Sequence, residues 1–219
     1  MSAVHEKLDE AARPRQRRKE ARPAELAEAA LALFVEKGFA ATRLEDVAAR
    51  AGVGKGTVYL YFESKEALFK AAIEAAMTPA VEAAEALAER GQQSAAARLR
   101  EFVRGWWQMV AHTSVGGLPK LLIAESGNFP DIVRWHYETI IRRAMRALGR
   151  IIEGGIASGE FRQVPVDFAT RIVFSPMFSI IVWTRAFGDT MCDLPEPERF
   201  LDEALDLLIN GLRGDRQCT

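Results

Sequence analysis

The chain has 219 residues and a mass of 24.3 kDa; 49% of its residues are hydrophobic and 27% are charged. This size and composition exclude a disulfide-stapled miniprotein, a fibrous repeat and a chain without a folded core. Two cysteines, Cys192 and Cys218, are too few for a disulfide framework, so we expect a reducing, cytoplasmic location. The chain starts without an apolar leader, and its longest apolar run, residues 172–183, is shorter than a membrane span, so we predict no membrane association.

Positive charge gathers in one short stretch near the start of the chain. The formal net charge of the whole chain is -1, but residues 13–22 contain six Lys or Arg residues and one acidic residue. We therefore predict a flexible basic arm over residues 1–22. Such a run is either a solvated tail or a contact to nucleic acid, and the segment that follows it decides between the two.

Three short helices are expected directly after the arm. Apolar residues recur at helical spacing over residues 23–37. Thr42 and Glu45 have the spacing of a capping box, which predicts a second helix over residues 44–51. A third helix is expected over residues 55–62, after a glycine-containing turn. Two short helices around such a turn are typical of a helix-turn-helix motif.

The rest of the chain also has helical patterns of apolar residues. The expected helices cover residues 65–90, 98–113, 118–125, 131–156, 167–187 and 196–212. No segment alternates apolar and polar residues as a half-buried strand would, so the predicted fold class is all-α with about nine helices. We expect a three-helix helix-turn-helix domain over residues 23–70, a helical bundle over residues 71–213 and a tail over residues 214–219.

The expected third helix carries side chains that are suited to reading DNA. Lys55, Thr57 and Tyr59 lie on or beside its exposed side. Free amides at a helix start and a lysine amine attract phosphate, and a tyrosine ring can contact a thymine methyl group. An ordinary connector helix is one alternative. A phosphate-binding P-loop is another, but Ala49 occupies the position of its first glycine, and Gly56 occupies that of its Ser or Thr.

Residues 24–73 resemble the DNA-binding domain of the TetR family of bacterial transcriptional repressors. The matching motifs are Leu33-Phe34-x-x-Lys37-Gly38-Phe39, Ala41-Thr42, Val47-Ala48-x-x-Ala51-Gly52-Val53, Lys55-Gly56-Thr57-Val58-Tyr59-x-Tyr61-Phe62 and Ser64-Lys65-Glu66-x-Leu68. The C-terminal half is similar, over residues 121–130, to AefR-like and AcrR-like members of the family.

The resemblance implies a set of DNA contacts. Major-groove contacts are expected from Lys55, Gly56, Thr57 and Tyr59, phosphate contacts from Tyr61 and from the amine and amide of Lys65, and backbone contacts from Thr42 and Arg43. The basic arm, with Arg17 and Arg18, is then expected to contact phosphate or the minor groove. The implied partner is a pseudo-palindromic double-stranded operator bound by a homodimer.

The resemblance also implies a C-terminal domain that binds a ligand and dimerises. Aromatic side chains are concentrated there, and the expected pocket residues are Phe102, Trp106, Met109, His112, Glu125, Trp135 and Phe178. Each of these large side chains can instead be ordinary core. His112, His136 and Glu125 are the candidates for a polar anchor in a mainly apolar wall. We therefore expect a flat, hydrophobic, neutral or cationic ligand.

The last two long helices are expected to form the dimer interface, because each is too apolar on one face to be exposed to water. The expected interface residues are Phe168, Ile172, Trp183, Leu201, Leu205, Leu208 and Leu212.

These observations favour a homodimeric repressor that a small hydrophobic ligand releases from its operator. One alternative is a TetR-like regulator without a ligand; a bundle cavity of several hundred cubic ångströms would argue against it. A helical enzyme or lipid carrier is the second alternative. The sequence has no Gly-x-Ser-x-Gly elbow, convergent acid pair or metal-ligand spacing, so we predict no enzymatic activity, no cofactor and no metal.

Overall fold

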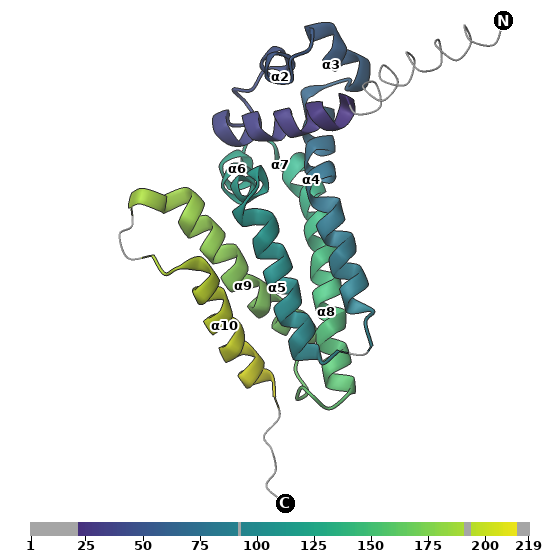
Figure 1. The fold of residues 1–219 in the computed structure, drawn as a ribbon, viewed down its shortest axis with the longest axis vertical. Helices are drawn as coiled ribbons and strands as arrows, with labels where there is room; N and C mark the ends of the chain where they lie inside the picture. Colours follow the sequence, from purple (N-terminus) through teal and green to yellow (C-terminus); the bar gives the residue numbers. More distant parts are fainter. Residues whose placement is uncertain (1–21, 92, 191–193, 214–219) are drawn as a thin grey trace, which may run out of the picture. The chain divides into compact units, whose positions relative to one another are not determined.

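The computed structural model describes residues 22–91, 93–190 and 194–213. Within these residues the chain is mainly helical and contains no strand, which confirms the all-α fold class. The chain divides into two compact units, residues 1–76 and 77–219. Figure 1 shows the helices of each unit in chain order.

The first unit is a three-helix domain followed by the start of a fourth helix. A first helix over residues 22–37 precedes α2 (Leu44–Arg50), α3 (Lys55–Tyr61) and α4 (Lys65–Ala88). These bounds lie within two residues of the predicted ones. The first helix ends because Gly38 adopts a φ of 87°, in the left-handed region that favours glycine.

The turn of the helix-turn-helix also depends on a glycine. Gly52, between α2 and α3, has a φ of 65°, and the next amide, that of Val53, donates to the carbonyl of Ala48 at 2.9 Å. This bond ties the turn back to α2. Val58 then becomes the buried residue of α3, with no exposed surface.

The expected capping box at the start of α2 is wrong. Arg43 occupies the N-cap position, and no side chain caps the helix. The Thr42 side chain is only 1% exposed. Its hydroxyl donates to the carbonyl of Gly38 at 2.7 Å and lies 3.3 Å from that of Leu33. Thr42 therefore connects the start of α2 to the end of the first helix instead of satisfying an amide of α2.

Three phenylalanines form the centre of the first unit. Phe34, Phe39 and Phe69 are at most 1% exposed, and their ring centroids lie 4.8 to 5.4 Å apart. The α4 helix begins beside this cluster, where the Ser64 hydroxyl accepts a hydrogen bond from the Ala67 amide at 3.0 Å. The Lys65 amine lies 4.7 Å from the centre of the Phe39 ring.

The second unit is a helical bundle. Its further helices are α5 (Ala95–Ala111), α6 (Leu118–Glu125), α7 (Pro130–His136), α8 (Arg142–Ala157), α9 (Val166–Val182) and α10 (Pro197–Leu212). The single helix expected over residues 131–156 is interrupted by a π-helical turn over Tyr137–Ile141. A second π-helical turn, Trp183–Phe187, follows α9. Such turns are rare and are frequently found at functional sites.

The core of the second unit lies between α5, α8, α9 and α10. Leu99, Leu148, Ile151 and Met177 are among its fully buried members. The start of α5 is held by the Glu160 carboxylate, which accepts hydrogen bonds from the Ala95 and Ala96 amides at 2.6 and 3.0 Å. A carboxylate at a helix start satisfies free amides and interacts favourably with the helix dipole.

One described stretch, Val166–Phe187, is long and apolar enough to cross a membrane by length and composition. Core helices of soluble proteins pass the same test. Within the second unit this stretch packs against α8 and α10.

We predict that Gly52→Ala lowers the free energy of unfolding of the first unit by about 1 to 2 kcal/mol, because an L side chain is strained at a positive φ. Gly56→Ala is the control, since Gly56 lies inside α3 without a positive φ and an added Cβ there meets no atom within 4 Å. Urea unfolding of both variants measures the difference. Equal losses would contradict the role assigned to the φ of Gly52.

Candidate functional site

The α3 helix exposes a compact set of side chains on the first unit. Lys55 and Gly56 are exposed at its start, and Tyr59 is 50% exposed one turn later. Thr57 is half-buried. An added Cβ at Gly56 meets no atom within 4 Å, so the backbone there is open to a close partner. The structure thus brings these four predicted DNA-reading residues together on one short helix.

Leu60 belongs to the same surface, although the sequence analysis missed it. It is 81% exposed, the largest exposed fraction among the exposed large hydrophobic side chains of the described residues. Leu60 therefore buries little of its apolar surface within its own chain. Its position between Tyr59 and Tyr61, opposite the buried Val58, was the signal that could have identified it.

The Lys55 amine already has a partner on α2. Its Nζ atom lies 2.5 Å from a Glu45 carboxylate oxygen, and both side chains are substantially exposed. The hydrogen bond between them raises the pKa of Lys55 and lowers that of Glu45. A phosphate at Lys55 therefore competes with the Glu45 carboxylate for the charge of this amine.

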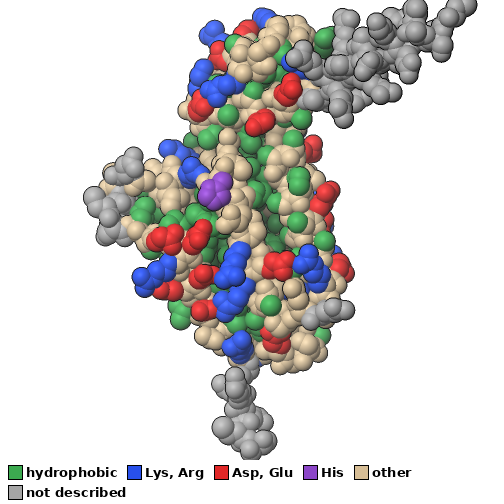
Figure 2. Space-filling view, viewed as in Figure 1, with side chains coloured by type: hydrophobic (Ala, Val, Ile, Leu, Met, Phe, Trp, Pro, Cys, Tyr) green, Lys and Arg blue, Asp and Glu red, His purple; other side chains and the backbone are tan. Residues whose placement is uncertain are grey.

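Other charges of the first unit are also paired. Lys37 contacts Asp46 at 3.2 Å, and Arg50 contacts Glu36 at 2.6 Å. On the face seen in Figure 2, basic and acidic side chains lie interspersed. Residues 22–76 contain seven Lys or Arg residues and eight Asp or Glu residues. The unit as described has no excess of positive charge.

Two of the expected phosphate contacts have other roles in the structure. The Lys65 amine donates to the carbonyls of Phe39 and Ala40 at 2.8 and 3.1 Å, which uses two of its three N–H donors; the phosphate contacts expected of its amine and amide stay predictions. The buried Thr42 hydroxyl is likewise occupied. Arg43 is exposed and Tyr61 is half-buried.

The remaining expected contacts lie outside the described residues. Arg17 and Arg18 belong to the basic arm, so their part in DNA binding stays a prediction.

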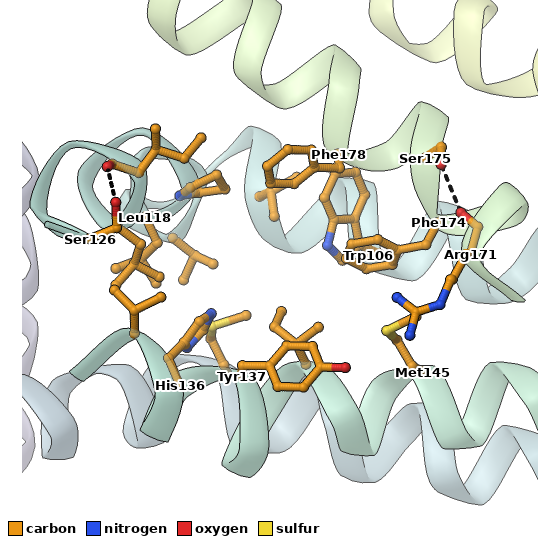
Figure 3. A pocket seen from close by; sticks show the side chains of 18 residues that line it. Trp106, Leu118, Ser126, His136, Tyr137, Met145, Arg171, Phe174, Ser175 and Phe178 are labelled. Atoms are coloured by element: carbon orange, nitrogen blue, oxygen red, sulfur yellow. Dashed lines mark hydrogen bonds between the residues drawn. The ribbon is translucent and has the colours of Figure 1, made fainter. Parts of the chain in front are cut away.

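The second unit contains an apolar cavity of about 550 Å³. Figure 3 shows Trp106 and Phe178 on one side of it, and His136 and Tyr137 on the other. The lining residues are Met77, Trp106, Val110, Val115, Leu118, Pro119, Leu122, Ile123, Ser126, Val133, His136, Tyr137, Ile141, Met145, Arg171, Phe174, Ser175 and Phe178. This volume lies in the range of small-molecule sites.

The predicted pocket residues are only partly found in this wall. Trp106 and Phe178 line the cavity as expected. Phe102 and Met109 line a smaller cavity of about 200 Å³, which shares Trp106 with the first. His112, Glu125 and Trp135 line neither cavity.

For His112 and Trp135 the physical reason is helix phase, while Glu125 is the last residue of its helix. His112 is the exposed residue that ends α5, so it has turned away from the wall that Trp106 forms. On α7 the inward position belongs to His136, and Trp135 is one residue, or about 100°, around the helix. Glu125 ends α6, whose Leu122 faces the cavity.

His136 is the buried polar side chain of the cavity wall. It is 7% exposed, and its Nδ1 atom is buried without a hydrogen-bond partner. Burial lowers the pKa of His136 to about 4 because it disfavours the charged imidazolium. At neutral pH the ring is therefore uncharged, with one nitrogen as a donor and the other as an acceptor.

The expected interface residues divide into two groups. Leu201, Leu205 and Leu212 are 3 to 8% exposed, which corrects their expected place in a dimer interface, because they fill the core of their own chain. Trp183 packs on Phe200, with ring centroids 5.6 Å apart.

The second group lies at the surface. Phe168 is 65% and Ile172 38% exposed. Both line an apolar groove of about 320 Å³, together with the half-buried Leu208 and with Leu207, which is 75% exposed and was not predicted.

No group of three or more His, Cys, Asp or Glu side chains among the described residues is placed to hold a metal ion.

An exposed helix-turn-helix and a helical unit with an apolar cavity, on one chain, define the class of DNA-binding transcriptional regulators. Two family models match this chain: "Bacterial regulatory proteins, tetR family" over residues 26–72, and "AefR-like transcriptional repressor, C-terminal domain" over residues 97–209. The chain belongs to the TetR family, as its motifs indicated, and this is a family of transcriptional regulators, not of enzymes.

Relatives and solved structures agree with this assignment. The uncharacterized HTH-type transcriptional regulator YfiR of Bacillus subtilis is 31% identical over 150 residues, which cover 67% of this chain and 71% of that protein. FadR of Bacillus subtilis, in complex with stearoyl-CoA, has the same fold with a TM-score of 0.71, 20% identity and coverage of 87% of this chain and 99% of that one.

The complex of SmeT with triclosan superposes with a TM-score of 0.74 and 19% identity, covering 90% of this chain and 93% of that one. SmeT is the repressor of a Stenotrophomonas maltophilia multidrug efflux pump.

We predict that His136 makes the protein less stable in mild acid. Between pH 6.5 and about 4 the unfolded chain binds a proton at His136 that the folded chain does not, so the free energy of unfolding falls as the pH decreases. Between pH 7 and 5 the expected loss is about 2 kcal/mol. His136→Phe should abolish this loss, as measured by urea unfolding at both pH values. The same pH dependence in both proteins would contradict the burial of a neutral ring.

Proposed function

We propose that this protein is a homodimeric cytoplasmic repressor that a small apolar ligand releases from a pseudo-palindromic DNA operator. The observation that carries the proposal is the presence, on one chain, of an exposed α3 helix and an apolar cavity of about 550 Å³. A regulator without a ligand is less favoured, because a filled pocket would leave no cavity of this size. The family assignment argues against an enzyme or a lipid carrier.

DNA reading is assigned to the exposed side of α3. Lys55 supplies charge for a phosphate, Gly56 leaves the backbone open, and Tyr59 supplies a ring and a hydroxyl. Leu60 is added to the residues expected from the sequence, because an apolar side chain exposed on such a helix can contact the methyl group of thymine.

Dimerisation is assigned to the groove formed by α9 and α10. Phe168, Ile172 and Leu207 would leave a large apolar area in water if the chain remained a monomer. The proposed occupant of this groove is the same surface of a second copy, related by a twofold axis that also relates the two α3 helices. A pseudo-palindromic operator has the matching symmetry.

Release by a ligand is assigned to the cavity that Trp106 and His136 line. FadR and SmeT, which have similar folds, hold stearoyl-CoA, with its long acyl chain, and triclosan, with its aromatic rings. The α4 helix contributes Phe69 and Ile73 to the core of the first unit and Met77 to the cavity wall of the second. A ligand that lowers operator affinity a hundredfold must bind the released conformation about a hundredfold better than the DNA-bound one, a difference of roughly 2.7 kcal/mol.

The basic arm is assigned to phosphate contacts. Residues 22–76 have no positive excess, whereas residues 13–22 hold six basic residues. An arm of this composition would supply the attraction to DNA that the described unit lacks.

We predict that Lys55→Ala and Tyr59→Ala each weaken binding to an operator selected from random duplexes, by between about five- and a hundredfold. Circular dichroism should show unchanged helicity, because both side chains are exposed. Lys37→Ala is the matched control, since it removes the same charge and a comparable exposed ion pair away from α3. Normal operator binding by both α3 variants would remove the assignment of DNA reading to this helix.

Leu60→Ala is expected to weaken operator binding by about 1 kcal/mol. The operator affinity of the variant should no longer depend on one thymine methyl group. Replacing the operator thymines one at a time by deoxyuridine removes each methyl group and keeps the base pairing. One such replacement should weaken binding of the unaltered protein and leave that of the variant unchanged. Additive losses at every position would show that Leu60 contacts no thymine.

Leu207→Glu together with Phe168→Glu is predicted to give a folded monomer in sedimentation, because charges in an apolar interface cannot be paired there. Leu205→Glu is the comparison variant. It should lose helicity, because Leu205 is 3% exposed within its own chain. A doubly substituted protein that remains dimeric would place the interface elsewhere.

Salt dependence tests the basic arm. Deleting residues 1–20 should flatten the slope of log affinity against log salt by about 0.9 for each phosphate contact that is lost. An unchanged slope would make the arm a solvated tail.

A further inference from the structure

The unpaired nitrogen of His136 needs an explanation beyond the fold. Buried polar atoms are nearly always hydrogen-bonded, and leaving one unpaired costs about 1 to 3 kcal/mol. His136 is 7% exposed, its Nδ1 atom has no partner, and Figure 3 shows its ring directed into the cavity. Because Nδ1 itself is closed off from a water-sized probe, a compound in the cavity can reach the polar atoms of this ring only at its other nitrogen, Nε2.

The charge of the cavity wall is positive only. Arg171 is the lining residue that carries a full charge at neutral pH, and no Asp or Glu is among the lining residues. The Arg171 guanidinium has no ion-pair partner among the described residues. Figure 3 shows the side chain reaching from α9 toward Tyr137 and Met145, with Tyr137 between Arg171 and His136 in that view.

The other polar groups of the wall do not compensate this charge. The Ser175 hydroxyl donates to the Arg171 carbonyl at 2.8 Å, and the Ser126 hydroxyl donates to the Ile123 carbonyl at 2.8 Å. Both hydroxyls therefore use their hydrogens within their own helices. Most of the remaining wall is aliphatic or aromatic.

We propose that this cavity binds an apolar compound that ends in an acidic group, with the acidic group at the Arg171 guanidinium and a hydroxyl or carbonyl of the same compound hydrogen-bonded to His136. The inference rests on the proposed function, since it names the chemical class of the effector. It replaces the neutral or cationic ligand expected from the sequence, because a cation would meet Arg171 and find no carboxylate in the wall.

The two proposed anchors, Arg171 and His136, lie at different depths of the cavity. Arg171 is exposed and His136 is buried. An ionised group is costly to bury, so the acidic end lies at the mouth of the cavity, where water and Arg171 both reach it. The uncharged His136 ring can accept or donate a hydrogen bond at depth without the cost of a buried charge.

Three ten-carbon probes test the charge preference: decanoate, 1-decanol and decyltrimethylammonium, added to the full-length protein without DNA. Calorimetry should show decanoate binding about tenfold more tightly than 1-decanol, and the cation binding most weakly. Arg171→Gln should remove the preference for decanoate. Lys120→Gln is the matched control, because it removes the same charge from an exposed residue of α6 that does not line the cavity, and it should keep the preference.

Equal binding of the three probes, tighter binding of the cation, or no binding of decanoate would overturn the acidic class. An Arg171→Gln protein that still prefers decanoate would remove Arg171 as the anchor.

The His136 anchor is tested with 3-hydroxydecanoate and 10-hydroxydecanoate. At least one of them should bind the unaltered protein more tightly than decanoate, and His136→Phe should abolish that gain while decanoate binding is retained. If neither hydroxyl improves binding, His136 is not an anchor.

These outcomes are separable from those of the proposed function. An acidic probe that binds with the expected preference but leaves operator affinity unchanged contradicts release by the ligand and leaves the ligand class standing. Operator binding without any head-group preference contradicts the ligand class alone.

Discussion

The hydrogen bonds of the Lys65 amine join the start of α4 to the turn after the first helix, and α3 lies in the segment between these two points. The amine donates to the carbonyls of Phe39 and Ala40 and lies over the Phe39 ring. Phe39 packs in turn on Phe34 of the first helix and Phe69 of α4. These contacts bind α4 to the turn after the first helix, while Val58 is the fully buried side chain of α3 and Thr57 and Tyr61 are half-buried. The rest of its surface is left for a partner.

The second unit differs from the first, because it contains an open apolar cavity beside its packed core. An apolar cavity loses the dispersion contacts that a filled core would have, and the unpaired nitrogen of His136 adds a further cost. A ligand that fills the space restores the lost dispersion contacts, so binding to the folded state stabilises it. Tyr137 and Ile141, from the π-helical turn, line this same cavity. A π-helical turn therefore lies where a ligand would be held.

The sequence predicted the first unit well because its signals are local. Glycines at positive φ and short apolar stripes fix each helix within a few residues. The second unit was harder to predict. An apolar stripe shows that one face of a helix is buried, but it does not show which element covers that face. Leu205 belongs to the apolar stripe of α10 and is covered by its own chain. Leu207, outside the stripe, is the exposed one. His136 lines the cavity and Trp135 does not, although the two residues are neighbours on α7.

Charge pairing explains why the DNA-reading helix cannot act by attraction alone. Lys55 is bonded to Glu45, and Lys37 and Arg50 are also paired with acids. When Lys55 moves to a phosphate it gives up one exposed ion pair for another, and the gain comes mainly from counterions released by the DNA. The carboxylate of Glu45 is then left close to the phosphates and opposes binding. In the proposed mode of binding a single such unit is therefore a weak DNA ligand, and tight binding would require either a second α3 helix on the same duplex or the basic residues that precede the first helix.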